Sequence, residues 1–132
     1  MNLVNKTVFI LAFTFSGFVQ ADDFKKSDLE RWGEQFNDVA KEGRRLFTSP
    51  ELGSNGVVCA QCHPNGANTH PETYPKFQKQ LGKVAMMWEM VNWCIENPLE
   101  GMPLDADDSE MIAIHAYVAQ ERKGVALDPG RH

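Results

Sequence analysis

The sequence is short of basic residues, of long apolar runs and of cysteines. Lys and Arg total 13 against 18 Asp and Glu, which gives the 132-residue chain a formal net charge of −5. A negative field opposes binding to a phosphate backbone, so we expect no nucleic-acid partner. Hydrophobic residues make up 42% and charged residues 23% of the chain, an ordinary globular composition. The length suits one domain with a modest core.

The most apolar segment is too short to span a bilayer. Lys6 precedes an apolar run from Val8 to Val19, whereas a membrane-spanning helix needs about 20 apolar residues. A basic residue, a short apolar stretch and then Val19-Gln20-Ala21 form the layout of a secretory signal. The sequence therefore predicts a signal over residues 1–21, cleaved after Ala21, with an uncleaved anchor as the alternative. We expect one domain over 22–132, located in the periplasm and without stable membrane insertion.

Three cysteines are an odd number for a set of disulfides in an exported chain. Cys59 and Cys62 belong to Cys-Ala-Gln-Cys-His, a C-x-x-C-H motif that ends in His63. This is the attachment sequence of c-type haem, in which the two thiols bond the porphyrin and the histidine ligates the iron. We therefore predict one covalently attached haem c. A disulfide, a dithiol redox site, and a zinc site that also uses Cys94 and His70 are the alternatives.

Apolar spacing predicts a long helix before the motif. Ser27 and Glu30 form a capping box, and apolar residues then recur in steps of three and four up to about Phe47. Pro50 ends the helix. The residues expected to form one buried stripe are Leu29, Trp32, Phe36, Val39, Ala40, Gly43, Leu46 and Phe47.

The remaining chain is also read as helices and loops. Residues 51–75 are rich in Gly, Asn and Pro and need a cofactor to order them. Residues 76–94 are expected to be helical in one or two pieces, and a last helix runs from Asp107 or Asp108 to about Arg122. We see no persuasive strand pattern. The predicted fold is all-α, a small cytochrome c fold of three to five helices around one covalently bound haem.

Two local features support that fold. The carbonyl of Pro75 is placed to accept the Nδ1 hydrogen of His63, which would orient the imidazole. Gly43 and Tyr117 suit a close crossing of the first and last helices, because a missing side chain admits an aromatic ring. This pairing resembles the contact between the terminal helices of class I cytochromes c.

The sixth iron ligand sets the role of such a haem, and two residues compete for it. Met102, in Gly101-Met102-Pro103 before the last helix, occupies the place where class I cytochromes carry their thioether ligand. A thioether raises the potential. Cys94, as thiolate, would lower it.

Residues 58–130 are similar to the amino-terminal haem domain of bacterial thiosulfate dehydrogenases. The shared features are C-x-x-C-H with Asn65-Gly66 and Thr69, Gly82-Lys83-Val84, Val91-Asn92-Trp93-Cys94-Ile95-Glu96, Gly101, Pro103-Leu104, Asp108-Ser109-Glu110-Met111 and Ala116-Tyr117-Val118. The resemblance implies that Cys94 is the distal haem ligand, with Met102 as the alternative. That family carries two haems, whereas this chain has one C-x-x-C-H, and it usually has lysine at the position of Met102.

We therefore expect a periplasmic electron-transfer cytochrome linked to the oxidation of sulfur compounds, with periplasmic redox proteins as partners. One haem accepts one electron, while joining two thiosulfates releases two, so a carrier without catalysis of its own is favoured over an enzyme. The alternatives are a catalytic haem subunit of a thiosulfate- or tetrathionate-converting enzyme and a haem-based sensor.

Overall fold

The structure is a computed structural model that describes residues 23–127. The predicted signal and its cleavage site lie outside the described residues. The fold is mostly helical, as predicted, and is dominated by helix α1 (Lys26–Thr48) and helix α4 (Ser109–Arg122). None of the helices in the described part of the chain combines the length and apolar character needed to cross a membrane.

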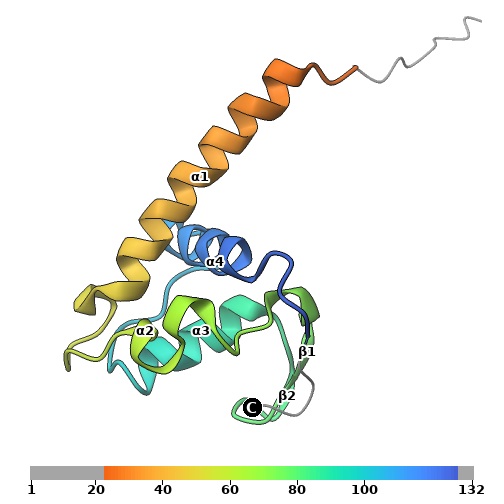
Figure 1. The fold of residues 1–132 in the computed structure, drawn as a ribbon. Helices are drawn as coiled ribbons and strands as arrows, with labels where there is room; N and C mark the ends of the chain where they lie inside the picture. The colour runs from red at the N-terminus through yellow and green to blue at the C-terminus, as the bar shows by residue number, and fades with distance from the viewer. Residues whose placement is uncertain (1–22, 128–132) are drawn as a thin grey trace, which may run out of the picture.

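Helices α1 and α4 cross (Figure 1), and Gly43 lies at the crossing. A Cβ atom built on Gly43 would lie 1.8 Å from the Ala113 carbonyl oxygen and 2.8 Å from Tyr117 Cβ. Next to the crossing, the rings of Phe47 and Tyr117 pack with their centroids 5.2 Å apart. The predicted close contact of Gly43 with Tyr117 is therefore confirmed. The buried residues of the core cluster are Leu46, Phe47, Leu52, Leu99, Ala113, Ile114, Tyr117 and Val118.

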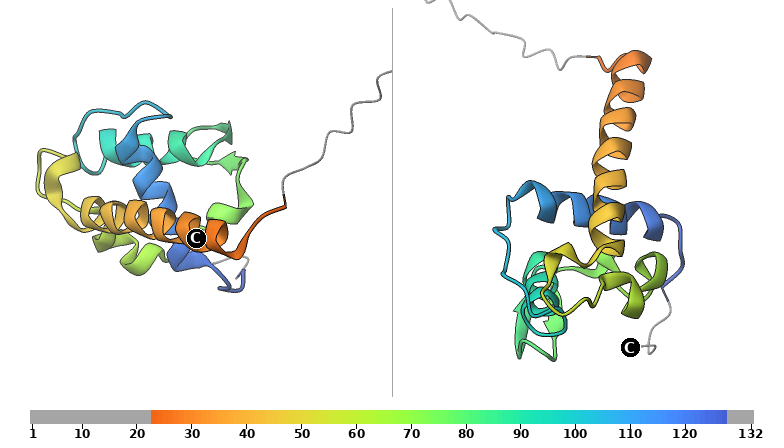
Figure 2. Two further views of the ribbon diagram at one scale, coloured as in Figure 1. Left: turned by 90° about the horizontal axis from the view of Figure 1, so that it is seen from above. Right: turned by 90° about the vertical axis from the view of Figure 1, so that its left-hand side faces the viewer.

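Only the second half of α1 belongs to this core. Figures 1 and 2 show that the first half projects from the rest of the molecule. The expected stripe is buried at Ala40, Gly43, Leu46 and Phe47, but Leu29, Trp32, Phe36 and Val39 are exposed. The prediction of one continuous buried stripe is wrong for its first half, because α4 crosses α1 once and covers only the turns at the crossing.

Short elements fill the segment between these two helices. They are the 3-10 turns Pro50–Leu52, Pro64–Gly66 and Pro71–Thr73, the one-turn helix α2 (Cys59–Cys62), the strands β1 (Lys76–Gln78) and β2 (Lys83–Ala85), and helix α3 (Met87–Glu96). The strands form an antiparallel hairpin in which Phe77 pairs with Val84.

The hairpin corrects the expectation of a helix over residues 76–94. Helix α3 begins only at Met87. Gly82 adopts a φ of +66°, and its N–H donates to the Gln78 carbonyl at 2.8 Å. Glycine adopts this left-handed conformation without steric cost. The turn at Gly82 therefore reverses the chain, and residues 76–85 pair as strands instead of forming a helix.

The two long helices begin at side-chain caps. Asp108 accepts a hydrogen bond from the Glu110 N–H at 2.9 Å, so α4 starts at one of the two predicted positions. At the start of α1, the Lys25 N–H donates to the Asp28 carboxylate at 3.2 Å. The cap therefore lies two residues before the predicted Ser27 and Glu30 box.

Candidate haem site

The C-x-x-C-H motif is held on a single helical turn. Cys59 and Cys62 are the first and last residues of α2, and residues three apart on a helix lie on one face. Cys59 is half-buried and packs against the core cluster, whereas Cys62 is exposed. His63 follows as the C-terminal cap of α2, with its N–H donating to the Cys59 carbonyl at 3.0 Å. The local chain therefore carries two thiols three residues apart on one helical turn, directly followed by an imidazole.

The imidazole is oriented by the turn that follows it. His63 Nδ1 lies 2.8 Å from the Ala67 carbonyl oxygen, which fits donation from a protonated Nδ1. This contact leaves Nε2 free to ligate a metal. Asn65 and Gly66, both at positive φ, fold the chain back so that the Ala67 carbonyl reaches the ring.

The predicted partner of His63 was a different carbonyl. Pro75 is exposed and stands directly before β1, while Ala67 makes the contact with Nδ1. The prediction for the Pro75 carbonyl is therefore wrong. Asn65-Gly66 is a strong turn signal. A turn there brings the carbonyl of Ala67, four residues after His63, back to the imidazole, so this signal could have identified Ala67 as the partner.

Cys94 lies on α3, near enough to the thiols of Cys59 and Cys62 for their charge to affect it. Its side chain is half-buried, and burial, together with the neighbouring thiols of Cys59 and Cys62, raises the pKa of Cys94 to about 11. Burial also raises the pKa of Cys59. The structure thus brings the distal candidate favoured by the resemblance close to the two attachment thiols. A thiol must lose its proton to ligate a metal, so ligation of Cys94 would release one.

Tyr74 is a neighbour of Cys94 that the sequence analysis did not identify. Burial raises the pKa of Tyr74 to about 12, against the opposing effect of a hydrogen bond from the Gln78 side chain, and Cys94 adds to the rise. Tyr74 is half-buried. No sequence motif marks Tyr74. Its position follows from the fold, because it comes directly after the turn at Pro71–Thr73.

Met102 is placed differently from Cys94. Its side chain is 82% exposed, and it lines a surface hollow of about 350 Å³ together with Leu52, Gly53 and Glu110. The neighbouring Gly101 is fixed in this position, because a Cβ on it would lie 1.9 Å from the Leu52 carbonyl oxygen. The structure therefore does not bring Met102 together with Cys59, Cys62 and His63.

The side chains around the motif fit a large, flat apolar group. Partly buried apolar residues pack against the core beside Cys59 and remain incompletely covered by the polypeptide. They are Val57, Ala60, Met87, Val91 and Leu104. Two thiols on one helical turn and an oriented imidazole are the set that attachment of haem c uses. The residues present therefore fit haem c.

The zinc alternative required His70 to join the cysteines. His70 is buried with φ at +48°, and its Nδ1 lies 3.5 Å from the Glu72 carboxylate. Within residues 23–127, no group of three or more His, Cys, Asp or Glu side chains is placed to hold a metal ion. His70 thus does not assemble with the cysteines as a zinc site requires.

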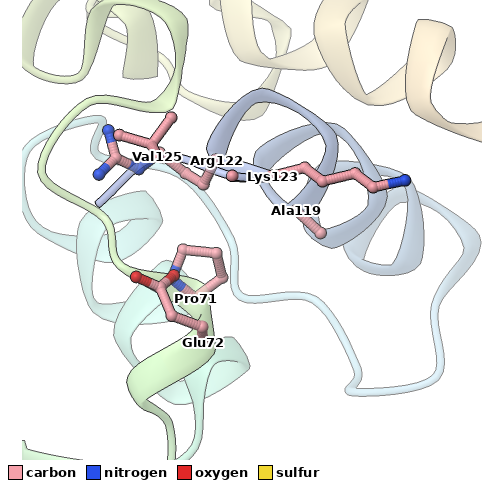
Figure 3. Close-up of a pocket in the computed structure, with 7 residues that line it drawn as sticks. Pro71, Glu72, Ala119, Arg122, Lys123 and Val125 are labelled. Carbon is pink, nitrogen blue, oxygen red and sulfur yellow. The ribbon is translucent and has the colours of Figure 1, made fainter. Parts of the chain in front are cut away.

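A second hollow lies between the turn at Pro71–Thr73 and the end of α4 (Figure 3). It measures about 410 Å³ and is lined from the turn at Pro71–Thr73 by Pro71 and Glu72, and from the end of α4 by Arg122 and Lys123. It contains none of the predicted site residues. The hollow is lined by one acidic and two basic side chains and lies at the carbonyl end of a helix. This mixture of charges favours neither an anionic nor a cationic ligand.

Comparisons with known proteins match this part of the chain. A family model described as "SoxA/TsdA, cytochrome c domain" matches residues 42–127, which include the C-x-x-C-H motif, Cys94 and Met102. A thiosulfate dehydrogenase of Psychrobacter arcticus is 31% identical over 99 residues, covering 65% of this chain and 30% of that protein. A thiosulfate dehydrogenase of Stutzerimonas stutzeri is 28% identical over 95 residues, covering 62% of this chain and 31% of that protein. The match thus spans about a third of the length of each relative.

Proposed function

This chain belongs to the SoxA/TsdA cytochrome c domain family, and we propose from this premise that it is a periplasmic electron-transfer cytochrome linked to the oxidation of sulfur compounds. Membership confirms the resemblance inferred from the sequence and the small cytochrome c fold. It also implies haem c as the cofactor. That the chain holds one haem, and that it is exported, are parts of the proposal.

The observation that carries the proposal is the arrangement of the motif. Cys59 and Cys62 share one turn of α2, and the Ala67 carbonyl fixes His63 Nδ1 at 2.8 Å. A hydrogen bond of this kind fixes the tautomer and the ring orientation and raises the donor strength of Nε2. This is the preparation that a proximal iron ligand needs.

Each residue of the site then has a defined task. When bound, haem c supplies a one-electron couple of its iron. Cys59 and Cys62 hold the group covalently, and His63 provides the proximal nitrogen. Cys94 is the distal ligand that we favour, because the resemblance gives this role to its position and it lies near the attachment thiols. A thiolate there stabilises the oxidised state. Met102 is the alternative.

Electron transfer requires no proton donor or acceptor from this chain. The protein supplies ligands, an apolar surrounding and a docking face for its partners, which we propose to be redox proteins of the periplasm. The sequence contains one C-x-x-C-H, and one such haem takes up one electron. A reaction that releases two electrons would therefore need a second acceptor outside this site.

The proposal is tested by producing the full-length chain in a host with export and haem-attachment machinery. We expect a periplasmic product whose mass exceeds that of the processed polypeptide by one haem, with a Soret band that shifts reversibly on reduction. A Cys59→Ala, Cys62→Ala variant is the matched control and should carry no covalent haem. A polypeptide without added mass or Soret absorbance would refute the proposal.

A second candidate function follows from the names of the relatives. Both matched proteins are thiosulfate dehydrogenases, so this chain could act as the catalytic haem subunit of a thiosulfate- or tetrathionate-converting enzyme. The test is reduction of an artificial one-electron acceptor by thiosulfate in the presence of the haem-loaded chain. Turnover that disappears in Cys94→Ala would favour the catalytic role, and reduction of the haem without turnover would favour the carrier.

A further inference from the structure

Residues 101–104, the Met102 segment, are held in place at both ends. At the first end, the Gly101 N–H donates to the Ile95 carbonyl oxygen at 2.8 Å, and a Cβ on Gly101 would lie 3.0 Å from Ile95 Cγ2. At the second end, Leu104 packs against the core cluster. The chain between these two positions is short, so the exposed thioether of Met102 stays where the two ends place it.

One buried side chain of α3, Asn92, holds the second end. Asn92 Nδ2 donates to the Leu104 carbonyl oxygen at 2.8 Å, and the Leu104 N–H donates to Asn92 Oδ1 at 2.9 Å. Asn92 is 8% exposed, so water competes little for these two hydrogen bonds. Two hydrogen bonds between one amide and one residue fix both the distance and the direction of the chain at Leu104.

The Met102 segment and Cys94 lie on different sides of α3. Positions two apart on an α-helix are turned by about 200° around its axis, so the side chains of Asn92 and Cys94 point in nearly opposite directions. Ile95 contacts Gly101 and follows Asn92 by three positions, which places it on the same side of the helix as Asn92. The segment is therefore held on the side of α3 that Cys94 does not use.

We propose that Asn92 is a positioning residue of the haem site, which keeps the thioether of Met102 from replacing Cys94 as the distal ligand. The inference rests on the proposed function, since it requires a haem attached to the chain. Without the Asn92 amide, Leu104 loses both hydrogen bonds to α3, and Met102 gains the freedom to approach the iron. Asn92 thereby favours a thiolate, which lowers the reduction potential, over a thioether, which raises it.

The first test is spectroscopic and uses the haem-loaded full-length chain without the competing thiolate. In Cys94→Ala alone, Asn92 still holds the Met102 segment, so the ferric spectrum should lack the long-wavelength band of thioether ligation. In Cys94→Ala, Asn92→Ala this band should appear, and the reduction potential should rise above that of Cys94→Ala. Adding Met102→Leu to this pair should abolish both changes.

The second test measures hydrogen exchange at the Leu104 amide of the haem-loaded chain. Asn92→Ala removes the acceptor of this N–H, so the amide should lose its protection. Asn92→Asp keeps the acceptor and removes only the donor to the Leu104 carbonyl, and it gives a milder release should Asn92→Ala fail to fold. Circular dichroism shows which variants are folded.

Asn97→Ala is the matched control. Asn97 follows the last residue of α3, and its side chain also donates to a backbone carbonyl, that of Trp93, at 2.8 Å. It forms no bond to the Met102 segment. Added to Cys94→Ala, it should produce no thioether band, and it should leave the Leu104 amide protected.

Three results would overturn the proposal. A thioether band in Cys94→Ala alone would show that Met102 reaches the iron while Asn92 holds its segment. A Leu104 amide that stays protected in Asn92→Ala would show that the segment is held by other contacts. No thioether band in a folded double variant whose Leu104 amide is unprotected would show that release does not bring Met102 to the iron. An unaltered chain without covalent haem would refute the proposed function instead, so the two failures are distinguishable.

Discussion

The two halves of α1 follow the same apolar repeat and meet different surroundings. The second half loses its solvent contact to α4, with Gly43 against the Ala113 carbonyl. The first half keeps the repeat with larger side chains, Trp32 and Phe36, and leaves them partly exposed. The comparison teaches that periodicity identifies a packing surface but does not identify the element that covers it.

The sharpest test of the comparison is the same substitution in both halves. Gly43→Ala places a Cβ 1.8 Å from a backbone oxygen, which no side-chain movement relieves, so we expect a loss of more than about 3 kcal/mol or failure to fold. Gly33→Ala meets nothing within 4 Å and should stabilise the chain by about 0.5–1 kcal/mol through helix propensity. Urea unfolding, followed by circular dichroism at a protein concentration that keeps the chain monomeric, measures both. Equal effects would contradict the close crossing.

A matched pair of phenylalanines gives the next largest effect. Phe47 is 4% exposed and packs on Tyr117, so Phe47→Ala should cost about 3–5 kcal/mol. Phe36 is 46% exposed, and Phe36→Ala should change the stability of the monomer by less than about 1 kcal/mol. If Phe36→Ala cost as much as Phe47→Ala in the monomer, the first half of α1 would be packed on its own chain.

The two candidates for the distal haem ligand show the same contrast, since Cys94 is half-buried and Met102 is exposed. We expect Cys94→Ala to change the ferric spectrum and raise the reduction potential of the haem-loaded chain, because it removes a charge-donating thiolate. Met102 is exposed, and leucine is similar to methionine in volume. Met102→Leu should therefore leave the spectrum and the reduction potential unchanged. The measurements are absorption spectroscopy and a redox titration. A change confined to Met102→Leu, with loss of the long-wavelength band of thioether-ligated ferric haem, would assign Met102 instead.

The smallest expected effect is the pH dependence of stability that comes from His115, a partly buried histidine on α4. Burial lowers the pKa of His115 on α4, so the unfolded chain takes up a proton at a higher pH than the folded chain. The stability should therefore decrease as the pH falls through about 6.5, the ordinary histidine value. His115→Gln should reduce this decrease in unfolding experiments at a series of pH values. Identical curves for both proteins would contradict the burial of this imidazole.

Contiguous patterns were the part of this protein that its sequence predicted well. The C-x-x-C-H motif places two thiols and an imidazole together because all three lie within five residues, and no distant contact is needed. Asp107 and Asp108 predicted the start of α4 to within one residue for the same reason, and the structure assigns the cap to Asp108. Gly43 and Tyr117 are far apart in sequence, but their residue types, one without a side chain and one with a large ring, suggested the crossing.

Predictions that depended on more distant neighbours were less accurate. The carbonyl beside His63 belongs to Ala67 rather than Pro75, since the positive φ angles of Asn65 and Gly66 shorten the path of the chain. Residues 76–85 form a hairpin where a helix was expected, because the turn at Gly82 outweighs the apolar spacing. Tyr74 beside Cys94 carried no signal in the sequence.

The sequence by itself determined the attachment motif, the helical repeat of α1 and, to within one residue, the start of α4, because each depends on residues close together along the chain. Only the tertiary structure decided which part of that repeat is covered, that Cys94 lies near the attachment thiols and that Met102 is exposed. These outcomes depend on where α3, α4 and the loops lie in space, and that position follows from the packing of the whole core.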